Sequence, residues 1–334
     1  MKAILMTAAG NPNVLQLTEI KEPTIQSPTE ILVRLKAAGI NPIDTKLRSH
    51  GTFHPDRLPS ILGCDGAGIV EVIGTNVTKF QIGDEVYFCN GGLGAHQGNY
   101  AELTTIDEKF AAHKPKSLSF EQAAAAPLVL LTAWEALYDR GRLESLSTNR
   151  QLLIHAGAGG VGHVAIQLAK LRGATICTTV STEAKAQFAS DLGVDLPILY
   201  KQTDFVEAAI AWTNGEGVSL AFDTVGGKLI EQTFPAVKVY GDLVTILEPP
   251  ADINWKVART RNLCFSFELM LTPMLLGNTN LQIQQTKILT ECAKLFDSGK
   301  LKIHVNEVFP LAEAAKAHQL LETGSTTGKL VLTI

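Results

Sequence analysis

The chain contains 334 residues, of which 46% are hydrophobic and 19% are charged. At about 150 residues per domain, this length suggests two domains, each with enough apolar residues for a core. The composition therefore excludes a disordered chain and a small disulfide-stabilised protein. With 29 basic and 33 acidic residues, the formal net charge is −4. A mildly acidic chain without a basic segment is a poor candidate for binding nucleic acid or an anionic membrane surface.

The cysteines and the apolar segments indicate a soluble, cytoplasmic protein. The five cysteines are widely spaced and form no Cys-x-x-Cys pair, which argues against a zinc ribbon, a disulfide framework or a redox dithiol. We therefore expect reduced thiols, as in the cytoplasm. The longest apolar run, at 123–131, is about half of a membrane span, and the N-terminal segment turns polar too early for a signal-peptide core.

The first 120 residues have the pattern of a β-rich domain. Apolar and charged residues alternate at 31–36 and 68–74, and a third short segment at 83–88 follows a turn. Alternation with a period of two predicts half-buried strands. Frequent glycine and proline residues between these segments are typical of a small barrel or sandwich.

From about residue 121 the pattern changes to alternating strands and helices. Ser119 is a predicted helix N-cap, with Gln122 three residues later as in a capping box. Apolar residues at intervals of three and four predict a helix over 160–171. Strands are predicted at 151–156, 174–180, 218–225, 242–247 and 262–269. Strands that alternate with helices indicate βαβ units and a parallel sheet.

The C-terminal segment returns to mixed structure. A helical stripe ends at Gly299, and it precedes a predicted strand near 302–309, a helix at 311–322 and a strand at 328–334. The chain has no internal repeat and no long linker. We therefore predict an α/β protein, in which a β-rich domain accompanies a doubly wound parallel sheet.

The most specific motif is AGAGGVG at 156–162. Gly157, Gly159 and Gly162 form the pattern G-x-G-x-x-G, and Gly160 and Val161 complete the turn. The motif follows a predicted strand and opens a predicted helix, which is the context of a dinucleotide-binding loop. A tight turn needs a residue without Cβ, and the free N–H groups at the helix N-terminus bind a pyrophosphate. The alternative is a glycine-rich turn without a ligand.

The end of the second strand of this domain favours NADPH over NADH. NAD sites usually carry an acidic residue here, about 20 residues after the loop, to bind the ribose 2′-OH. In this chain that place falls on Val180, Ser181 and Thr182. The Ser181 hydroxyl and the Lys185 ammonium are available to a 2′-phosphate. The alternative is that Lys185 is a solvated charge on the following helix.

The whole chain resembles the medium-chain dehydrogenase/reductase superfamily, in particular its zinc-free quinone oxidoreductase (zeta-crystallin-like) branch. The resemblance rests on AAGINPIDTKLRSHG at 37–51, LGCDGAGIVEVIGTNVTKFQIGDEVY at 62–87, GNYAEL at 98–103, QAAAAPLVLLTAWEAL at 122–137, HAGAGGVGHVAIQLAK at 155–170, FDTVGG at 222–227 and FPLAEAAKAHQLLETGSTTGKLVL at 309–332. Together these segments are far more specific than any one of them. The resemblance implies a GroES-like catalytic domain of residues 1–124 and 270–334 and a Rossmann NADP-binding domain of residues 125–269. The active site would lie in the cleft between them.

The resemblance also bears on a metal. Zinc-dependent members have a His-Glu pair after a glycine, where this chain reads Gly63-Cys64-Asp65. They have a cysteine where Asn41 or Pro42 stands. A catalytic zinc needs three convergent ligands and an open position, and no three residues match such a set at a recognisable spacing. We therefore expect no metal.

The resemblance implies four polar residues near the cofactor or substrate. Asn41 would lie beside the nicotinamide or the substrate and donate to a carbonyl oxygen that gains negative charge, and Asp44 would orient its loop. Thr132 would lie near the nicotinamide half, and Tyr200 near the adenosine 2′-phosphate. The structural alternatives are a turn residue and a helix cap for the first two, and a helix hydroxyl and a half-buried strand-end ring for the other two.

Phe53 stands where many members carry a tyrosine, and it is the third residue expected at the catalytic side. A phenylalanine can form the wall of a pocket but cannot donate a proton, which disfavours enoyl-thioester reduction with a tyrosine acid. A quinone tolerates the change, because its reduced oxygens can take protons from water. Fold and resemblance imply further cofactor contacts at Val225 and Gly226 near the ribose, at Leu247, and at Phe265 and Phe267 near the carboxamide. The two phenylalanines could equally belong to the core.

The leading hypothesis is an NADPH-dependent quinone oxidoreductase, which transfers hydride directly from NADPH to a quinone without a metal. The second is an NADPH-dependent reductase of α,β-unsaturated carbonyls, including halogenated acrylates, which the motifs do not separate from the first. The third is a non-catalytic dinucleotide-binding protein with a structural or RNA-binding role, which the intact glycine loop and the lack of a basic stripe disfavour. We expect a homodimer, because the hydrophobic strand at 262–269 would be an aggregation liability as an open edge.

Overall fold

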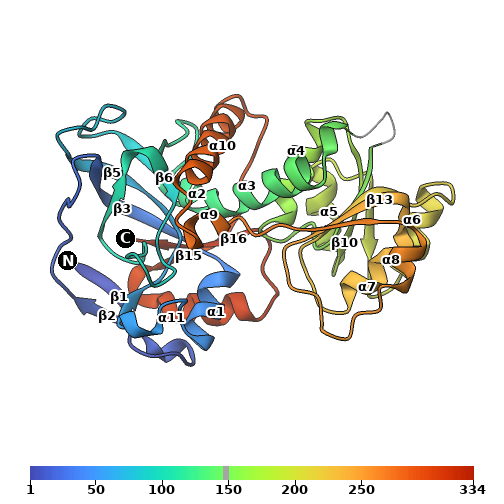
Figure 1. Ribbon diagram of the computed structural model, residues 1–334, viewed down its shortest axis with the longest axis horizontal. Coiled ribbons are helices and arrows are strands. Elements are labelled where there is room, and N and C mark those ends of the chain that lie inside the picture. The colour runs from blue at the N-terminus through green and yellow to red at the C-terminus, as the bar shows by residue number, and fades with distance from the viewer. Residues whose placement is uncertain (146–149) are drawn as a thin grey trace. The chain divides into compact units, whose positions relative to one another are not determined.

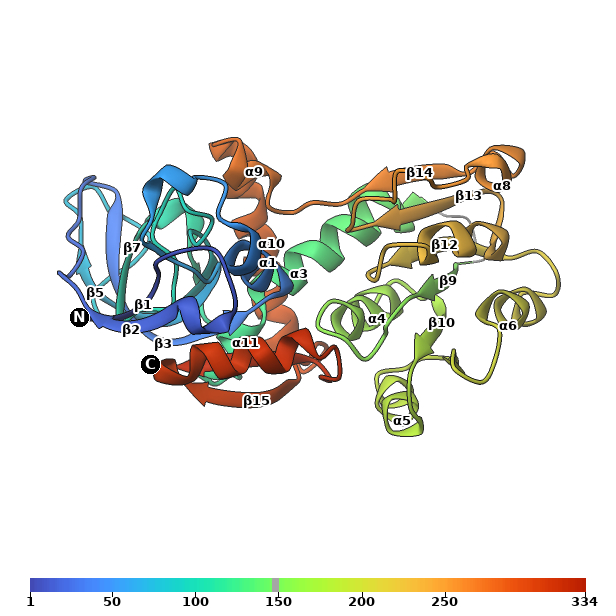
Figure 2. The ribbon, with the colours of Figure 1, turned by 90° about the horizontal axis from the view of Figure 1, so that it is seen from below.

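The computed structural model describes residues 1–145 and 150–334 (Figure 1). The chain forms two compact units. The first consists of Met1–Leu128 and Leu271–Ile334, and the second of Val129–Met270. Both ends of the chain therefore belong to the first unit (Figures 1 and 2).

The first unit contains two sheets. The larger is formed by β3 (Glu30–Ile40), β5 (Asp65–Ile73), β6 (Glu85–Cys89), β7 (Leu103–Asp107), β8 (Ala112–His113), β15 (Val305–Pro310) and β16 (Lys329–Thr333). Its strand order is β15-β16-β3-β5-β6-β8, and β7 also pairs with β3. The smaller is formed by β1 (Lys2–Met6), β2 (Leu15–Glu19) and β4 (Ser60–Ile61), in the order β2-β1-β4. The C-terminal segment thus adds two strands to a sheet begun near the N-terminus.

Strand β3 is the centre of this unit and is longer than its alternating pattern predicts. Ile31, Val33 and Leu35 are buried on one face, as the alternation indicates. The small residues that follow continue the strand, because both faces are covered there. A Cβ on Gly39 would lie 2.3 Å from the carbonyl oxygen of Ala124. Only glycine allows this approach.

The helices of the first unit are α1 (Pro42–His50), α2 (Phe120–Ala125), α9 (Thr272–Leu275), α10 (Thr279–Asp297) and α11 (Ala314–Glu322). The predicted capping box at the start of α2 is confirmed: the Ser119 hydroxyl accepts from the Gln122 N–H at 3.2 Å, and the Gln122 amide oxygen accepts from the Ser119 N–H at 3.1 Å. Gly299 adopts a φ of +70° just after α10, as predicted for the helix end. Helix α1 was not predicted.

The second unit is a six-stranded parallel sheet with helices. Its strands are β9 (Gln151–Ile154), β10 (Thr175–Val180), β11 (Leu196–Leu199), β12 (Val218–Asp223), β13 (Val237–Thr245) and β14 (Cys264–Phe267), and its helices include α4 (Gly162–Lys170), α5 (Glu183–Asp191), α6 (Phe205–Trp212), α7 (Leu229–Thr233) and α8 (Lys256–Thr260). Helix α3 (Pro127–Trp134) runs from one unit into the other. The order β11-β10-β9-β12-β13-β14 is the order 3-2-1-4-5-6 of a doubly wound Rossmann sheet, with β14 at one edge (Figure 2). The predicted fold class is therefore confirmed.

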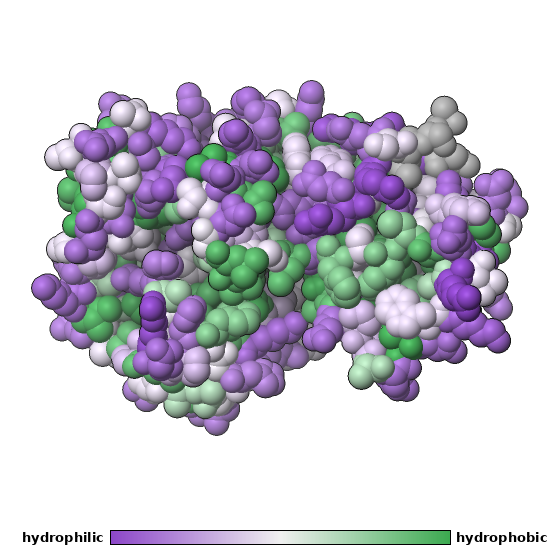
Figure 3. Space-filling model, viewed as in Figure 1, coloured by the Kyte–Doolittle hydropathy of each residue, from purple (hydrophilic) through white to green (hydrophobic). Residues whose placement is uncertain are grey.

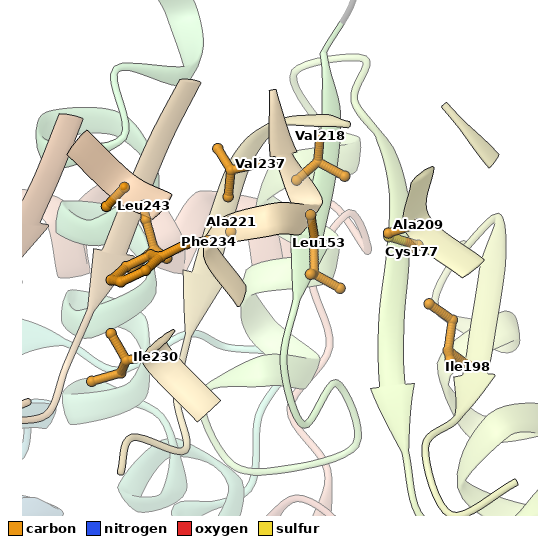
Figure 4. Close-up of a cluster of buried hydrophobic side chains, with 12 residues drawn as sticks. Leu153, Cys177, Ile198, Ala209, Val218, Ala221, Ile230, Phe234, Val237 and Leu243 are labelled. Carbon is orange, nitrogen blue, oxygen red and sulfur yellow. The ribbon is translucent and has the colours of Figure 1, made fainter. Parts of the chain in front are cut away.

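The core of the second unit lies against this sheet (Figure 4). Apolar side chains of five neighbouring strands meet side chains of α6, α7 and the turn after α7. The strand residues are Leu153, Cys177, Ile198, Val218, Ala221, Val237 and Leu243. Strands of a parallel sheet are covered on both faces, which explains their short, nearly continuous apolar runs.

Two strands of the six-stranded sheet differ clearly from the prediction. The edge strand β11 was not predicted, because its sequence LPIL contains Pro197, which is tolerated only at an edge. Strand β13 begins at Val237, five residues before the predicted start. Its register against β12 shifts after Val237, and Tyr240 has a φ of +60°. Such an irregularity interrupts the apolar pattern that a sequence reading uses.

Hydrophilic side chains cover much of the face shown in Figure 3, with smaller hydrophobic areas between them. The apolar half of the composition is thus compatible with the buried cores of both units. Within residues 1–145 and 150–334, no helix is long and apolar enough to cross a membrane.

Candidate active site

The second unit has a crevice at the carboxyl ends of its central strands, where a dinucleotide can bind. Strands β9 and β12 are neighbours, and the strand order runs outward from them in both directions. The connections at their carboxyl ends therefore leave toward opposite faces, which opens the crevice where doubly wound sheets bind ligands. The glycine motif follows β9, and the segment Thr224–Gly227 follows β12.

The glycine loop is tightly packed, and at two of its positions a side chain larger than hydrogen would clash with neighbouring atoms. A Cβ on Gly157 would lie 2.1 Å from the Thr178 hydroxyl, and one on Gly162 would lie 2.3 Å from the carbonyl oxygen of Ala156. Helix α4 begins at Gly162, directly after Val161. The N–H groups of His163 and Val164 donate to the carbonyl oxygens of Gly159 and Val161, at 3.1 Å and 3.2 Å, so it is the positive end of the helix dipole that suits an anion here.

His155, which the sequence analysis did not select, holds the start of this loop. The residue is fully buried, and its Nδ1 and Nε2 lie 3.1 Å and 2.9 Å from the hydroxyls of Thr179 and Thr233. Thr179 also accepts the N–H of Ala156, at 3.0 Å. Burial lowers the pKa of His155 to about 4, so the ring is neutral at neutral pH.

The turn after β12 is held by a buried carboxylate. Asp223 accepts the N–H groups of Val225 and Gly226, each at 3.0 Å, and the Thr245 hydroxyl at 2.7 Å. Gly226 has a φ of +78°, and a Cβ there would lie 2.6 Å from the side chain of Leu247. The structure thus brings three of the predicted cofactor residues, Val225, Gly226 and Leu247, to one place.

Basic and hydroxyl groups meet at the carboxyl ends of β10 and β11. Ser181 follows β10, and the Thr182 hydroxyl caps α5 by accepting the Lys185 N–H at 3.3 Å. Tyr200 follows β11 and is 51% exposed. Burial and then the positive charge of Lys201 lower the pKa of Lys185. Two ammonium groups therefore share this edge, which would attract a phosphate.

The remaining predicted cofactor residues of this unit are more widely spread. Thr132 is buried on α3. Phe265 packs against the core, and its ring lies 4.8 Å from that of Trp255 and 5.2 Å from that of Phe267. Phe267 is 54% exposed. Phe265 thus has a core role, as one of the two alternatives predicts.

In the first unit, Asn41 is fully buried and its amide is paired at both ends. Its Nδ2 donates to Asp65 Oδ2 at 2.9 Å, and its Oδ1 accepts from the Lys329 ammonium. Lys329 also donates to the carbonyl oxygen of Ile40, at 2.8 Å. Asp65 Oδ1 accepts the Leu128 N–H, at 2.9 Å. One Nδ2 hydrogen of Asn41 remains for a substrate oxygen, so this role stays a prediction.

Asp44 is a helix cap, as its structural alternative predicts. Its Oδ2 accepts the Asn41 N–H at 2.8 Å, at the start of α1. The same oxygen accepts the Tyr100 hydroxyl at 3.2 Å. Because Asp44 fixes the Asn41 backbone, it also orients the loop that carries the candidate amide.

Asp44, Asp65 and Lys329 form a buried cluster that carries a net negative charge when both carboxyl groups are ionised. Burial raises the pKa of Asp44 to about 7; the Asn41 N–H opposes this shift and Asp65 adds to it. Burial also raises the pKa of Asp65 and lowers that of Lys329, and each of these two charges offsets part of the other's shift. One ammonium can balance only one carboxylate. Both Asp65 oxygens accept N–H donors, whereas Asp44 Oδ1 has no protein partner, so we assign the retained proton to Asp44.

The side chains near Asp65 do not suit a zinc ion. The Asp65 oxygens are occupied by N–H donors. A hydrogen bond to Cys64, then burial and the Asp65 charge, raise the pKa of the Cys89 thiol well above its ordinary value. In the described part of the chain, no three His, Cys, Asp or Glu side chains are placed to hold a metal ion. Phe53 lies elsewhere in this unit, 52% exposed in the segment after α1.

Two family models match the chain. The alcohol dehydrogenase GroES-like domain matches residues 27–116, and the zinc-binding dehydrogenase model matches residues 192–332. A quinone oxidoreductase of Pseudomonas aeruginosa is 35% identical over 335 residues, which is 99% of each chain.

Two solved structures are similar over the full chain. The quinone oxidoreductase of Escherichia coli, complexed with NADPH, has a TM-score of 0.86 and 33% identity, with 100% of both chains covered. An alcohol dehydrogenase superfamily protein from Novosphingobium aromaticivorans has a TM-score of 0.90 and 32% identity, with 100% of this chain and 99% of that chain covered.

The chain belongs to the medium-chain dehydrogenase/reductase superfamily. Its relatives place it in the quinone oxidoreductase-like branch, which confirms the resemblance inferred from the sequence motifs. As a member of this superfamily it is an oxidoreductase that uses a nicotinamide dinucleotide. The glycine loop and the turn after β12 are the residues that fit this cofactor.

Replacing Gly162 by alanine should weaken dinucleotide binding, because the new Cβ would overlap the Ala156 carbonyl oxygen. Overpacking costs about 1–3 kcal/mol, which corresponds to about 5- to 150-fold in Kd if the loop shifts. NADPH fluorescence titration measures this change. Gly141→Ala is the control, since its Cβ would be crowded at 2.7 Å by the Leu220 side chain in the same unit but outside the glycine loop. Equal affinities for both variants would contradict the steric argument.

Replacing Asp44 by asparagine should remove part of the pH dependence of stability. The folded-state pKa of about 7 lies above the ordinary value of 3.8, so the contribution of Asp44 is complete below about pH 4 and is lost as the pH rises through 7. The wild type should therefore lose up to about 1.4 kcal/mol per pH unit across this window, and Asp44→Asn should not. Urea unfolding at several pH values measures this. Asp195→Asn, in the second unit, is the control, and an identical slope for wild type and Asp44→Asn would refute the assignment.

Proposed function

We propose that this protein is an NADPH-dependent quinone oxidoreductase that passes hydride directly from NADPH to a quinone, without a metal. The observation that carries the proposal is the pair of ammonium groups, Lys185 and Lys201, beside Ser181 and Tyr200 at the adenosine end of the crevice. It is supported by its relatives, which include quinone oxidoreductases, one of them solved in complex with NADPH.

The preference for NADPH rests on charge at the end of β10. The strand is followed by Ser181 instead of an acidic residue, so no carboxylate at that place would repel a 2′-phosphate. The partly buried Lys185 ammonium can pair with the phosphate in a site less hydrated than the open surface. Tyr200 supplies a hydroxyl at the neighbouring strand end.

The first unit would supply the acceptor side. When bound, NADPH supplies the hydride from C4 of its nicotinamide. The protein contributes orientation, and the remaining Nδ2 hydrogen of Asn41 would donate to the acceptor oxygen as negative charge develops. Direct hydride transfer needs no metal ligands, and the Asp65 oxygens and the Cys89 thiol are already engaged in hydrogen bonds. Phe53 would contribute apolar surface but no proton.

We also propose that the protein is a cytoplasmic homodimer that pairs at β14. This strand is the edge of the six-stranded sheet, and the flanking Phe267 and Leu269 are 54% and 52% exposed. An exposed apolar edge is normally covered.

The direct test is the initial rate of NADPH oxidation with an ortho-quinone, a para-quinone and a simple enone, repeated with NADH. We expect turnover of the quinones with NADPH and much slower turnover with NADH. Turnover of the enone alone would instead make the protein a double-bond reductase of α,β-unsaturated carbonyls. Tight NADPH binding without turnover of any acceptor would favour a non-catalytic role.

Replacing Lys185 by serine should raise the KM for NADPH and leave that for NADH unchanged. A hydrogen bond to a charged group contributes about 1.5–3 kcal/mol, which is about 10- to 150-fold in affinity. Steady-state kinetics with both cofactors measure the effect. Lys170→Ser is the matched control, because Lys170 pairs with Asp195 at 3.1 Å at the opposite end of β10. An equal change for NADH and NADPH would show that Lys185 does not read the 2′-phosphate.

A further inference from the structure

A buried chain of hydrogen bonds leads away from Asp44. Its Oδ2 lies 3.2 Å from the Tyr100 hydroxyl, and that hydroxyl lies 3.2 Å from His318 Nε2 on α11. All three side chains are fully buried. Each can both release and accept a proton, and each is within hydrogen-bond distance of the next.

Unpaired polar atoms cluster around this chain. Among the described residues, five buried side-chain atoms have no protein hydrogen-bond partner, and four of them are Asp44 Oδ1, His318 Nδ1, Arg48 Nε and Arg48 Nη1. Buried polar groups almost always find a partner, so the concentration of unpaired atoms here calls for a reason other than packing. Arg48 pairs with Glu322, whose side chain is 39% exposed, so the cluster reaches the surface of the unit.

We propose that Asp44, Tyr100 and His318 form a proton relay that delivers the proton consumed when the acceptor is reduced. The inference rests on the proposed function, which places Asn41 on the acceptor side; Asp44 adjoins it by accepting its N–H at 2.8 Å. Asp44 is the proton donor in this scheme. Tyr100 and His318 act through it and are not catalytic residues themselves.

The proton balance is closed. Addition of hydride to a quinone gives the hydroquinone monoanion, and its phenolate oxygen takes one proton to give the neutral hydroquinone. That proton leaves Asp44 from Oδ1, the oxygen without a protein partner. Tyr100 then protonates Oδ2, and His318 restores the phenol from Nε2. His318 Nδ1 takes a proton from water near Arg48 and Glu322, so each hydride consumes one solvent proton.

The charges around the relay favour this direction. Asp65 and Lys329 face Asp44, and burial together with the positive charge of Arg48 keeps His318 neutral by lowering its pKa to about 3. A neutral imidazole exchanges its proton between two nitrogens without building up charge. The thiols of Cys64 and Cys89 are protonated neighbours and do not compete for this proton.

The first test is Tyr100→Phe, which removes the hydroxyl and keeps the ring. We expect kcat with a quinone to fall about tenfold or more and the solvent deuterium isotope effect on kcat to rise, with KM for NADPH unchanged. Tyr87→Phe is the matched control, because Tyr87 is an equally buried tyrosine of the same unit whose hydroxyl donates only to the Leu289 carbonyl oxygen, at 2.5 Å. The same kcat and isotope effect in both variants as in the wild type would overturn the relay.

A second measurement does not depend on turnover. The infrared spectrum of the resting protein at neutral pH should contain the carbonyl band of a buried protonated acid that disappears in Asp44→Asn. This band should shift in Tyr100→Phe and also in His318→Asn. The second variant provides the test if Tyr100→Phe does not fold. A band that is absent, or unchanged in both variants, would overturn the relay. If none of the tested acceptors supports NADPH oxidation by the wild type, the proposed function fails. The infrared result still decides whether Asp44 holds a proton in this chain.

Discussion

One buried ammonium connects the parts of the first unit that are farthest apart in the sequence. Lys329 is the first residue of β16, the last strand, yet its Nζ donates to the Ile40 carbonyl oxygen and to the Asn41 amide oxygen. The amide in turn reaches Asp65, whose other oxygen accepts the N–H of Leu128 at the end of the N-terminal part. Since a buried ammonium that loses its hydrogen-bond acceptors is costly, this link constrains four segments at once.

The same constraint orients the candidate acceptor site. A cation can bond only to the oxygen of an amide, so Lys329 fixes which end of the Asn41 side chain is the donor. Asp44 fixes the backbone of the same residue from the other side. The cluster thus positions its amide by charge and capping, and the cost of burial is expressed in the raised pKa of Asp44.

In the second unit, buried polar side chains also hold backbone segments in place, but they do so without a charged partner. Asp223 holds the turn after β12 through backbone N–H groups, and neutral His155 holds the start of the glycine loop through two threonine hydroxyls. Both lie beneath the crevice at the strand ends. Turns that must bring their backbone close to a phosphate cannot be filled by side chains, so buried polar groups stabilise them from below.

The sequence by itself determined the α/β class, the glycine loop and the family, because these depend on short-range periodicity and on motifs that are contiguous in the chain. It also determined the cap at Ser119, whose partners are three residues apart. It did not reveal β11 or the early start of β13, since a proline and a register shift break the apolar pattern there. Only the tertiary structure brought Lys329, Tyr100 and His318 to Asp44 and Asn41. Their separations along the chain exceed any helical or strand period, although all three lie in family motifs, GNYAEL at 98–103 and FPLAEAAKAHQLLETGSTTGKLVL at 309–332. Pairing over such distances is decided by which strands join and what becomes buried, and these are properties of the whole fold.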